Sequence, residues 1–348
     1  MTFRAPAVVT RALQGALLSL ATMALTACSQ AAAIAQFDTL PPRPPDPRGH
    51  VEMRYLGSGG WLFTRGSDAI ATAPFVSNPT WFALLSTARP DTTLIDRHVP
   101  PMEHVEIVLV GHAHYDHAMD LPYIARTKAP KALFYGGQTV ANVLAAAIPD
   151  ARLRAVDGKD AAAVGDRPGR WFFNQARTIR FMPLRSTHAP HFARIKLVAT
   201  GTVEEKQTTL PGAPLRWKEG ETLAFIVDFL GPGGRVDFRI YYQDAASRPG
   251  TGIVPVLEGH DAARTDVAIL CVAAFAQVDG NPEHILTNVQ PRHVIGGHWE
   301  DFFFRGFEEP IRPAFGTSLE SFHRRARAAS SGPIYLPRPG ETIYLPTR

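Results

Sequence analysis

Short apolar runs alternate with longer amphipathic stretches through most of the chain from residue 50 onward. Short runs rich in β-branched and aromatic side chains are typical of strands, and three-to-four-residue apolar spacing is typical of helices. Strands are predicted at 51–56, 61–64, 69–72, 105–110, 131–135, 170–174, 178–184, 222–230, 236–242, 266–272, 292–295 and 342–345. Helices are predicted at 120–126, 138–148, 282–289 and 317–329. Strands and helices that alternate along one chain indicate an α/β fold.

The amino terminus has the composition of an export signal. Arg4 and Arg11 supply positive charge, and the apolar stretch that follows is short for a membrane span. It ends in Leu25-Thr26-Ala27-Cys28, which resembles the bacterial lipobox. The resemblance implies that residues 1–27 are a lipoprotein-type signal peptide and that Cys28 is lipidated. Because Ser29 is not Asp, it also implies a place in the cell envelope on the outer membrane, facing the periplasm. Ordinary cleavage nearby and an uncleaved anchor are the alternatives.

A proline-rich linker, residues 28–49, is predicted between this signal and a single folded domain, residues 50–348. Closely spaced prolines at 41–47 favour an extended polyproline conformation that would hold the domain off the membrane. Within the domain, the stretch 189–220 is interrupted by glycine and proline, and we predict that it forms a lid over the site.

The charge balance argues against a nucleic-acid partner. The chain has 36 basic and 32 acidic side chains, a formal charge of +4, and loss of Arg4 and Arg11 leaves 34 against 32, or +2. Nucleic-acid-binding domains carry a clustered excess of Lys and Arg that this balance lacks. If Cys28 carries a lipid, Cys271 is the one remaining cysteine and an intramolecular disulfide is excluded.

The densest run of potential metal ligands follows the predicted strand 105–110. It reads Gly111-His112-Ala113-His114-Tyr115-Asp116-His117, and packing alone does not explain three imidazoles and a carboxylate placed so close together. Alternate residues of an extended backbone point the same way, so His112 and His114 are able to hold one ion. Asp116 and His117, after the chain turns, are free to face a second.

This run resembles the His-x-His-x-Asp-His signature of the metallo-β-lactamase-fold hydrolases. The resemblance implies an α/β fold of the four-layer αβ/βα sandwich type, with two mixed β-sheets flanked by helices and the site at one edge between the sheets. It also implies a lone His, an Asp and a final His further along, each at a strand end. His188, Asp244 and His298 each follow a predicted strand and match that order.

The same resemblance implies a ligand assignment for two divalent metal ions. His112, His114 and His188 would bind one ion, Asp116, His117 and His298 the other, and Asp244 would bridge them. Nitrogen and oxygen ligands without a thiolate suit zinc, and also iron or manganese. Two such ions would hold a bridging hydroxide that attacks an electrophilic carbonyl or phosphorus.

Two positions depart from the pattern of the family, and one role is open. The strand 69–72 runs into Thr72-Ala73-Pro74, where the family usually has an Asp that supports the metal loop, and Gln243 stands where Gly often precedes the bridging Asp. The proton for the leaving group could come from Asp116, from His191 or from metal-bound water. His191 is interpreted either as a catalytic, site-lining residue that contacts the substrate or as a solvated loop His.

The resemblance implies a binuclear metal-dependent hydrolase. The run His114-Tyr115-Asp116-His117 is similar to that of N-acyl phosphatidylethanolamine phospholipase D, a phosphodiesterase of the same fold, and a membrane tether would suit a lipid substrate. We therefore expect cleavage of a phosphodiester or other ester bond in a lipid or small molecule. A lactonase or β-lactamase on the same site is the alternative. A metal-binding or metal-sensing lipoprotein is the alternative outside enzymes.

Overall fold

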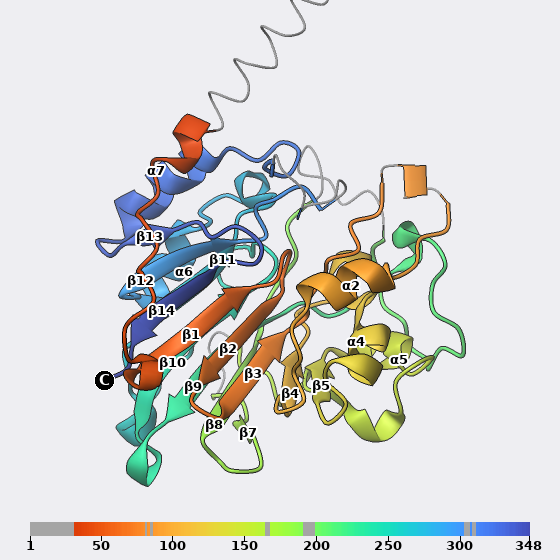
Figure 1. Ribbon diagram of the computed structural model, residues 1–348, viewed down its shortest axis with the longest axis horizontal. Coiled ribbons are helices and arrows are strands. Elements are labelled where there is room, and N and C mark those ends of the chain that lie inside the picture. The colour runs from red at the N-terminus through yellow and green to blue at the C-terminus, as the bar shows by residue number, and fades with distance from the viewer. Residues whose placement is uncertain are drawn as a thin grey trace, which may run out of the picture.

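Two seven-stranded β-sheets form the centre of the molecule (Figure 1). The structure is a computed structural model that describes residues 31–80, 82–83, 86–163, 168–190, 199–302, 307 and 311–348. The strand order is β14-β1-β2-β3-β4-β5-β6 in the first sheet and β13-β12-β11-β10-β9-β8-β7 in the second. Except for β14, the first sheet is therefore built from residues 50–155 and the second sheet from residues 172–335.

The elements have the following bounds. The first sheet contains β1 (His50–Tyr55), β2 (Trp61–Arg65), β3 (Asp68–Thr72), β4 (Ile107–Leu109), β5 (Leu133–Gly136), β6 (Leu153–Ala155) and β14 (Thr342–Pro346). The second contains β7 (Phe172–Phe173), β8 (Ile179–Arg185), β9 (Leu223–Leu230), β10 (Val236–Gln243), β11 (Val267–Cys271), β12 (His293–Gly297) and β13 (Ile334–Tyr335). The α-helices are α2 (Thr92–His98), α3 (Tyr115–Ala118), α4 (Leu121–Thr127), α5 (Gln138–Leu144), α6 (Glu283–Val289) and α7 (Leu319–Ala329).

Both sheets are mixed. Strands β14, β1, β2 and β3 pair antiparallel, and β3 to β6 pair parallel. In the second sheet β7 to β10 pair antiparallel and β10 to β13 parallel. Short turns join β1 to β2, β2 to β3, β7 to β8 and β9 to β10, whereas residues 186–222 separate β8 from β9. Parallel neighbours need longer crossovers, and these carry the α-helices. The predicted sandwich of two mixed sheets is confirmed.

The apolar faces of these elements produce four layers. The inner faces of the two sheets share one core, which includes Phe63 of β2 and Phe181 of β8, and α6 and α7 pack on the same cluster through residues such as Phe322. The outer face of the first sheet packs against α2, α4 and α5 in a second cluster that includes Val108 and Ile124. Strand β4 is therefore buried on both faces, which explains why 105–110 is a continuous apolar run.

The strands that precede the candidate ligands end at a common edge. In the first sheet β1, β3 and β4 run in one direction, and in the second β8, β10 and β12 do so. Figure 1 shows the arrowheads of β1 and β3 pointing to the end of the molecule where the chain enters beside α7. Side chains just after β4, β8, β10 and β12 can therefore meet between the sheets.

Some elements differ from the predictions in length or were not predicted. Strands β6 and β13 and helices α2 and α3 are too short to show a clear period in the sequence. The predicted helix 138–148 ends at Leu144 because the following turn tightens, with the Ala147 amide donating to the Leu144 carbonyl at 3.0 Å. Pro149 then disfavours further helix at the residue before it.

The described part of the predicted linker docks on the domain. Phe37 is buried in the main core, and the Asp38 amide donates to the Ile334 carbonyl at 2.9 Å. The Asp38 carboxylate in turn accepts from the Ile334 amide and from Arg327 of α7, both at 2.7 Å. These contacts hold residues 33–40 against α7 and β13, so this part of the segment is not a free spacer. The predicted signal peptide and Cys28 lie outside the described residues.

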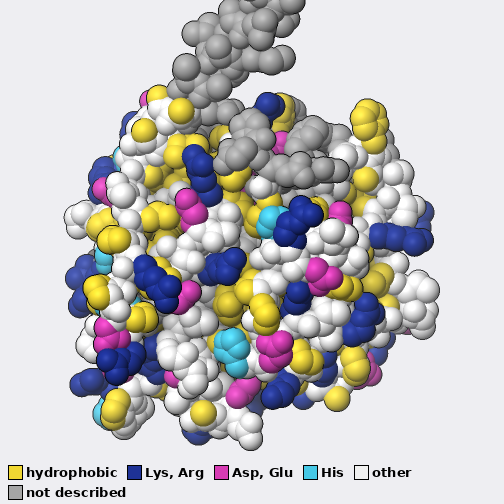
Figure 2. All heavy atoms as spheres, in the orientation of Figure 1, with side chains coloured by type: hydrophobic (Ala, Val, Ile, Leu, Met, Phe, Trp, Pro, Cys, Tyr) yellow, Lys and Arg dark blue, Asp and Glu magenta, His cyan; other side chains and the backbone are white. Residues whose placement is uncertain are grey.

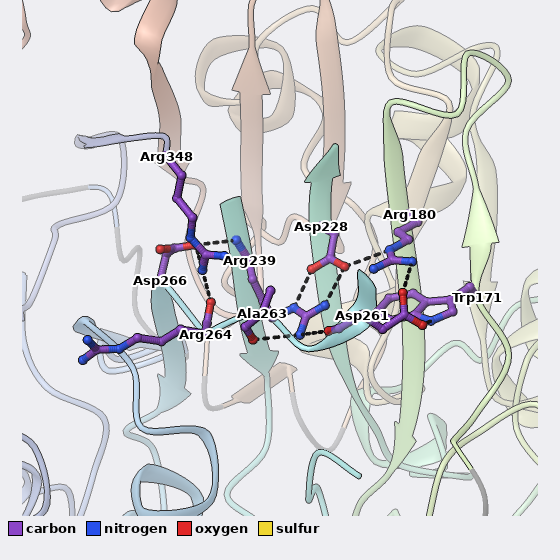
Figure 3. Close-up of polar contacts among 9 residues, drawn as sticks. All are labelled: Trp171, Arg180, Asp228, Arg239, Asp261, Ala263, Arg264, Asp266 and Arg348. Carbon is purple, nitrogen blue, oxygen red and sulfur yellow. Dashed lines mark hydrogen bonds and ion pairs between the residues drawn. The ribbon is translucent and has the colours of Figure 1, made fainter. Parts of the chain in front are cut away.

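A row of buried charges crosses three strands of the second sheet (Figure 3). Asp228 of β9 lies directly opposite Arg180 of β8 and Arg239 of β10 in the strand register. Its carboxylate accepts from Arg180 Nε at 2.8 Å and from Arg239 Nε at 2.7 Å. The Arg180 guanidinium also lies 3.9 Å from the Trp171 ring and donates to Asp261 at 2.6 Å. Asp228 is fully buried, so these partners provide the compensation that a desolvated charge requires.

The molecular surface is mixed in charge on the face shown in Figure 2. Basic and acidic side chains are interspersed there, without a broad field of one sign. In the described ranges no helix combines the length and the hydropathy needed to cross a bilayer.

Candidate metal centre

The His-rich run changes conformation between its second and third potential ligands. Residues after β4 are extended up to His114, which is the N-cap of α3 with φ −61° and ψ 156°. Asp116 and His117 then lie in the first turn of α3. In the extended part, the side chains of His112 and His114 lie on one side of the chain. The turn of α3 points the side chains of Asp116 and His117 in another direction, which is what two separate groups of ligands would require.

Three imidazoles form a triangle at the first of these positions. The ring centroids of His112, His114 and His188 are each 4.7 Å from the other two. Their ligand nitrogens lie within 4.8 Å of one another, close enough to bind one ion. The Ala189 carbonyl accepts from His188 Nδ1 at 2.6 Å, which leaves the lone pair of Nε2 for a metal.

A second group combines two imidazoles with a carboxylate. Asp116 Oδ2 lies 3.1 Å from His298 Nε2 and 3.4 Å from His117 Nε2, and all three residues are buried. Burial favours the neutral acid, but His117 and His298 outweigh it and hold the pKa of Asp116 well below its usual value. Asp116 is therefore a carboxylate, the form that binds metal, at neutral pH.

Asp244 connects the two groups. Its Oδ1 lies 3.2 Å from His112 Nδ1, and its Oδ2 lies 3.4 Å from His117 Nδ1. The Gly111 amide donates to Oδ2 at 3.1 Å. Each oxygen therefore faces a different imidazole group, as a bridging ligand must. Burial raises the pKa of Asp244 and lowers the pKa of His112, which keeps the His112 imidazole neutral and able to bind metal.

The hydrogen bonds around these side chains fit a pair of cations. Within the described residues, His112 Nε2, both ring nitrogens of His117 and His298 Nδ1 are buried without a hydrogen-bond partner. Polar atoms are seldom buried in that state because each loses its bonds to water. Metal coordination would compensate such a loss, and neutral imidazoles with carboxylates are ligands that zinc, iron and manganese accept.

Two glycines allow the ligands to approach the backbone. A Cβ on Gly111 would lie 2.2 Å from both carboxylate oxygens of Asp244, and a Cβ on Gly59 would lie 2.6 Å from His117 Nδ1. Any side chain at either position would displace a ligand. Gly59 belongs to the turn 57–60 between β1 and β2.

Hydroxyl groups occur where the resemblance implied a supporting Asp. Thr72 at the end of β3 donates to the Gly59 carbonyl at 2.5 Å, and Tyr242 of β10 donates to the same oxygen at 2.6 Å. Together they fix the turn that packs against His117. Thr72 was visible as a departure from the family pattern, but nothing in the sequence indicated that Tyr242 would join it.

Asp120 is a further buried residue that the sequence did not single out. Its carboxylate accepts from the Val76 and Ser77 amides at 2.9 and 3.1 Å and from Ser77 Oγ at 2.6 Å. Burial raises the pKa of Asp120 to about 6 despite these donors. Asp120 anchors the loop that follows β3 to the start of α4, directly after the metal-ligand run.

All seven predicted metal ligands therefore meet between the two sheets, in three overlapping groups: His112 with His114 and His188, His112 with His117 and Asp244, and Asp116 with His117 and His298. Their role as ligands stays a prediction until metal is measured. His191, the other predicted catalytic residue, lies outside the described residues. Of the predicted lid 189–220, the described part runs beside the site, with the Ala199 carbonyl 3.3 Å from His114 Nε2 and the Glu219 carbonyl accepting from the Ala113 amide at 2.9 Å.

Comparisons with known proteins were made by sequence and by structure. No protein-family model matches the chain. A UPF0173 metal-dependent hydrolase from Cupriavidus taiwanensis is 22% identical over 308 residues, which cover 87% of this chain and 91% of that protein. The metallo hydrolase Igni18 of Ignicoccus hospitalis superposes with a TM-score of 0.49 at 15% identity, covering 86% of this chain and 100% of that one. The metallo-β-lactamase-fold protein YhfI of Bacillus subtilis gives a TM-score of 0.49 at 12% identity, with 85% and 100% coverage.

The strand order and the ligand positions lead to one conclusion about the architecture. Two mixed seven-stranded sheets lie between helical layers, and His and Asp side chains gather in the expected order at one edge. This arrangement agrees with the predicted metallo-β-lactamase-type sandwich, and the chain is similar over most of its length to a metal-dependent hydrolase.

Proposed function

We propose that this protein is a hydrolase that binds two divalent cations, zinc in the first place, and cleaves a phosphodiester or other ester bond. The observation that carries the proposal is the position of Asp244, whose two oxygens face His112 and His117 in different imidazole groups. Two-metal hydrolases need a bridging ligand of this kind to hold their ions close together.

The described residues have distinct parts in this proposal. His112, His114 and His188 would hold one ion, and Asp116, His117 and His298 the other, with Asp244 between them. When bound, the ions would supply Lewis acidity and lower the pKa of water towards neutrality. The depressed pKa of Asp116 keeps it in the carboxylate form, which is suited to hold an ion and has little affinity for a proton. Protonation of the leaving group would then fall to a group other than Asp116.

The proposed substrate is an ester of a lipid or small molecule, with a phosphodiester first. Two observations support a lipid. The run His114-Tyr115-Asp116-His117 is similar to that of a phospholipid phosphodiesterase, and the chain enters the domain at the end of the molecule where the ligand-bearing strands end (Figure 1). A lipid anchor on Cys28 would place that end towards a membrane.

The test combines metal analysis with turnover. Full-length protein in detergent, dialysed against zinc, should contain two zinc ions per chain by mass spectrometry and should hydrolyse bis(p-nitrophenyl) phosphate faster than a lactone or nitrocefin. Faster turnover of the lactone or of nitrocefin would replace the phosphodiester with the corresponding alternative. Two bound ions without turnover of any ester would favour the metal-binding lipoprotein.

The variant His114→Ala separates the two metal positions. It removes one corner of the three-imidazole triangle, whereas the group around Asp116 stays complete. We expect it to retain one zinc ion per chain, with an unchanged circular dichroism spectrum and activity reduced by at least about 100-fold. Two zinc ions in this variant would remove His114 from the ligand set.

A further inference from the structure

The backbone of His298 has a conformation that its residue type disfavours. His298 follows β12 with φ +49°, in the left-handed region that glycine adopts more readily than other residues. Such conformations persist where the surroundings determine them, and they cluster at functional sites. His298 is also the final member of the Asp116–His117–His298 group. Whatever holds this backbone therefore also decides where the imidazole points.

Tyr55 holds the His298 backbone from the opposite sheet. The Tyr55 hydroxyl accepts from the His298 amide at 2.8 Å and donates to Glu300 Oε2 at 2.6 Å. Tyr55 is the last residue of β1 and is fully buried, and the exposed fraction of Glu300 is only 2%. The hydroxyl therefore connects β1 of the first sheet to the turn after β12 of the second.

Glu300 extends this contact to the turn beneath His117. Its Oε1 accepts from the Ser58 amide at 2.5 Å, and its Oε2 accepts from the Trp299 amide at 3.2 Å. Ser58, with φ +48°, precedes Gly59, whose α-carbon packs against the His117 ring. One buried carboxylate is thus bonded to both backbone segments that position imidazoles of the same group.

We propose that Tyr55 and Glu300 are positioning residues that set the geometry of the Asp116–His117–His298 group and, through it, the affinity of that position for a divalent cation. The inference rests on the proposed function, because it assumes that this group binds metal. Neither side chain reaches the three-imidazole group by any hydrogen bond among the described residues. Their influence should therefore be confined to one of the two ions.

The variants Tyr55→Phe and Glu300→Gln test the two halves of the arrangement. Phe leaves the His298 amide and the Glu300 carboxylate without their shared partner. Gln keeps the volume but replaces one carboxylate oxygen with an NH2 group. Because NH2 donates and does not accept, either Ser58 or Tyr55 loses its acceptor. The matched control is Tyr123→Phe, which removes a hydroxyl of α4 that donates to Asp96 of α2 at 2.8 Å and not to a segment that carries a predicted ligand.

Zinc affinity is measured on the full-length proteins by competition with a chromophoric chelator, and the absorption of the cobalt-substituted forms reports ligand geometry. We expect wild type and Tyr123→Phe to bind two ions. Tyr55→Phe and Glu300→Gln should bind one ion with wild-type affinity and the other about 10- to 100-fold more weakly, as is usual when a partner behind a ligand is lost. The cobalt spectrum of the weakened position should change, while that of the three-imidazole position, the one lost in His114→Ala, should not.

Two results would count against different parts of this reasoning. If wild type binds two ions and both variants bind them with wild-type affinity and unchanged cobalt spectra, Tyr55 and Glu300 have no positioning role. If wild type itself binds no zinc, the proposed function fails. Circular dichroism shows whether Tyr55→Phe folds, and if it does not, the affinities of Glu300→Gln decide the question.

Discussion

Asp116 and Asp120 are both buried and lie four residues apart, yet their pKa values shift in opposite directions. At Asp116 burial is outweighed by His117 and His298, so the pKa is well below its usual value. At Asp120 burial is the largest effect and the donors around Ser77 are neutral, so the pKa rises to about 6. Imidazole partners therefore distinguish the carboxylate that is predicted to bind metal from one that supports a loop, even within one turn of chain.

The raised pKa of Asp120 predicts a loss of stability with rising pH. Because the folded-state pKa of about 6 exceeds the usual pKa of 3.8 for an Asp side chain, the neutral acid is the form that the fold favours. Its contribution is complete below pH 3.8 and is lost as the pH rises through about 6. A shift of this size corresponds to about 3 kcal/mol.

The variant Asp120→Asn isolates this effect, since an amide cannot ionise and still accepts from the Val76 and Ser77 amides. Urea unfolding measures the free energy of unfolding of both metal-free proteins at about pH 4 and about pH 8. From the lower to the higher pH, the stability of the variant relative to wild type should increase by about 3 kcal/mol. A difference between the two proteins that does not change with pH would contradict the raised pKa.

At the scale of elements, the charged row of Figure 3 fixes the relative register of β8, β9 and β10. Arg180, Asp228 and Arg239 are direct partners across these strands, and a shift of one residue would turn each side chain to the opposite face. His188 and Asp244 follow the far ends of β8 and β10. The row therefore helps to determine where two predicted ligands lie.

Replacement of Asp228 by Asn should destabilise the protein strongly. It leaves the guanidinium groups of Arg180 and Arg239 buried without their common carboxylate, a change that costs about 3–5 kcal/mol in buried pairs. Urea unfolding of the variant measures the loss. The control is Asp150→Asn, whose partner Lys206 and own side chain are largely exposed, so that the change should be below about 1 kcal/mol. Similar decreases in the free energy of unfolding in the two variants would show that the charged row does not stabilise the second sheet.

At the scale of the whole molecule, the amino-terminal segment and the metal centre are related by position. The chain docks on α7 and β13 through Phe37 and Asp38 and enters at the end of the molecule where the ligand-bearing strands end. A tether at Cys28 would therefore restrict the motion of the domain about its anchor and keep the site edge near the membrane.

The lipoprotein proposal predicts that Cys28→Ser abolishes acylation. In a bacterial host fed a labelled fatty acid, wild type should be labelled and recovered with the outer membrane, whereas the variant should be unlabelled. Cys271→Ala serves as the control because Cys271 is buried at the end of β11 and should not affect labelling. Labelled Cys28→Ser protein would exclude Cys28 as the acylation site.

Most of the fold could be predicted because its signals are local. The continuous apolar runs at β4, β9 and β11 indicate buried strands whatever their neighbours, and His188, Asp244 and His298 could be found because each follows such a run. Strands β6 and β13 escaped prediction because two or three residues show no alternation. The docking of Phe37 escaped prediction because the prolines around it indicated only an extended chain.

The sequence by itself indicated the candidate ligands and the strands that present them, since the His-rich run is local and its resemblance to a known signature implied the order of the others. Only the tertiary structure decided that Tyr55 would bond to the His298 backbone, that Thr72 and Tyr242 would share the Gly59 carbonyl, and that Asp120 would support the loop at Ser77. These contacts join segments up to 243 residues apart, and a hydrogen bond depends on distance and angle in space, which no local pattern of side chains records.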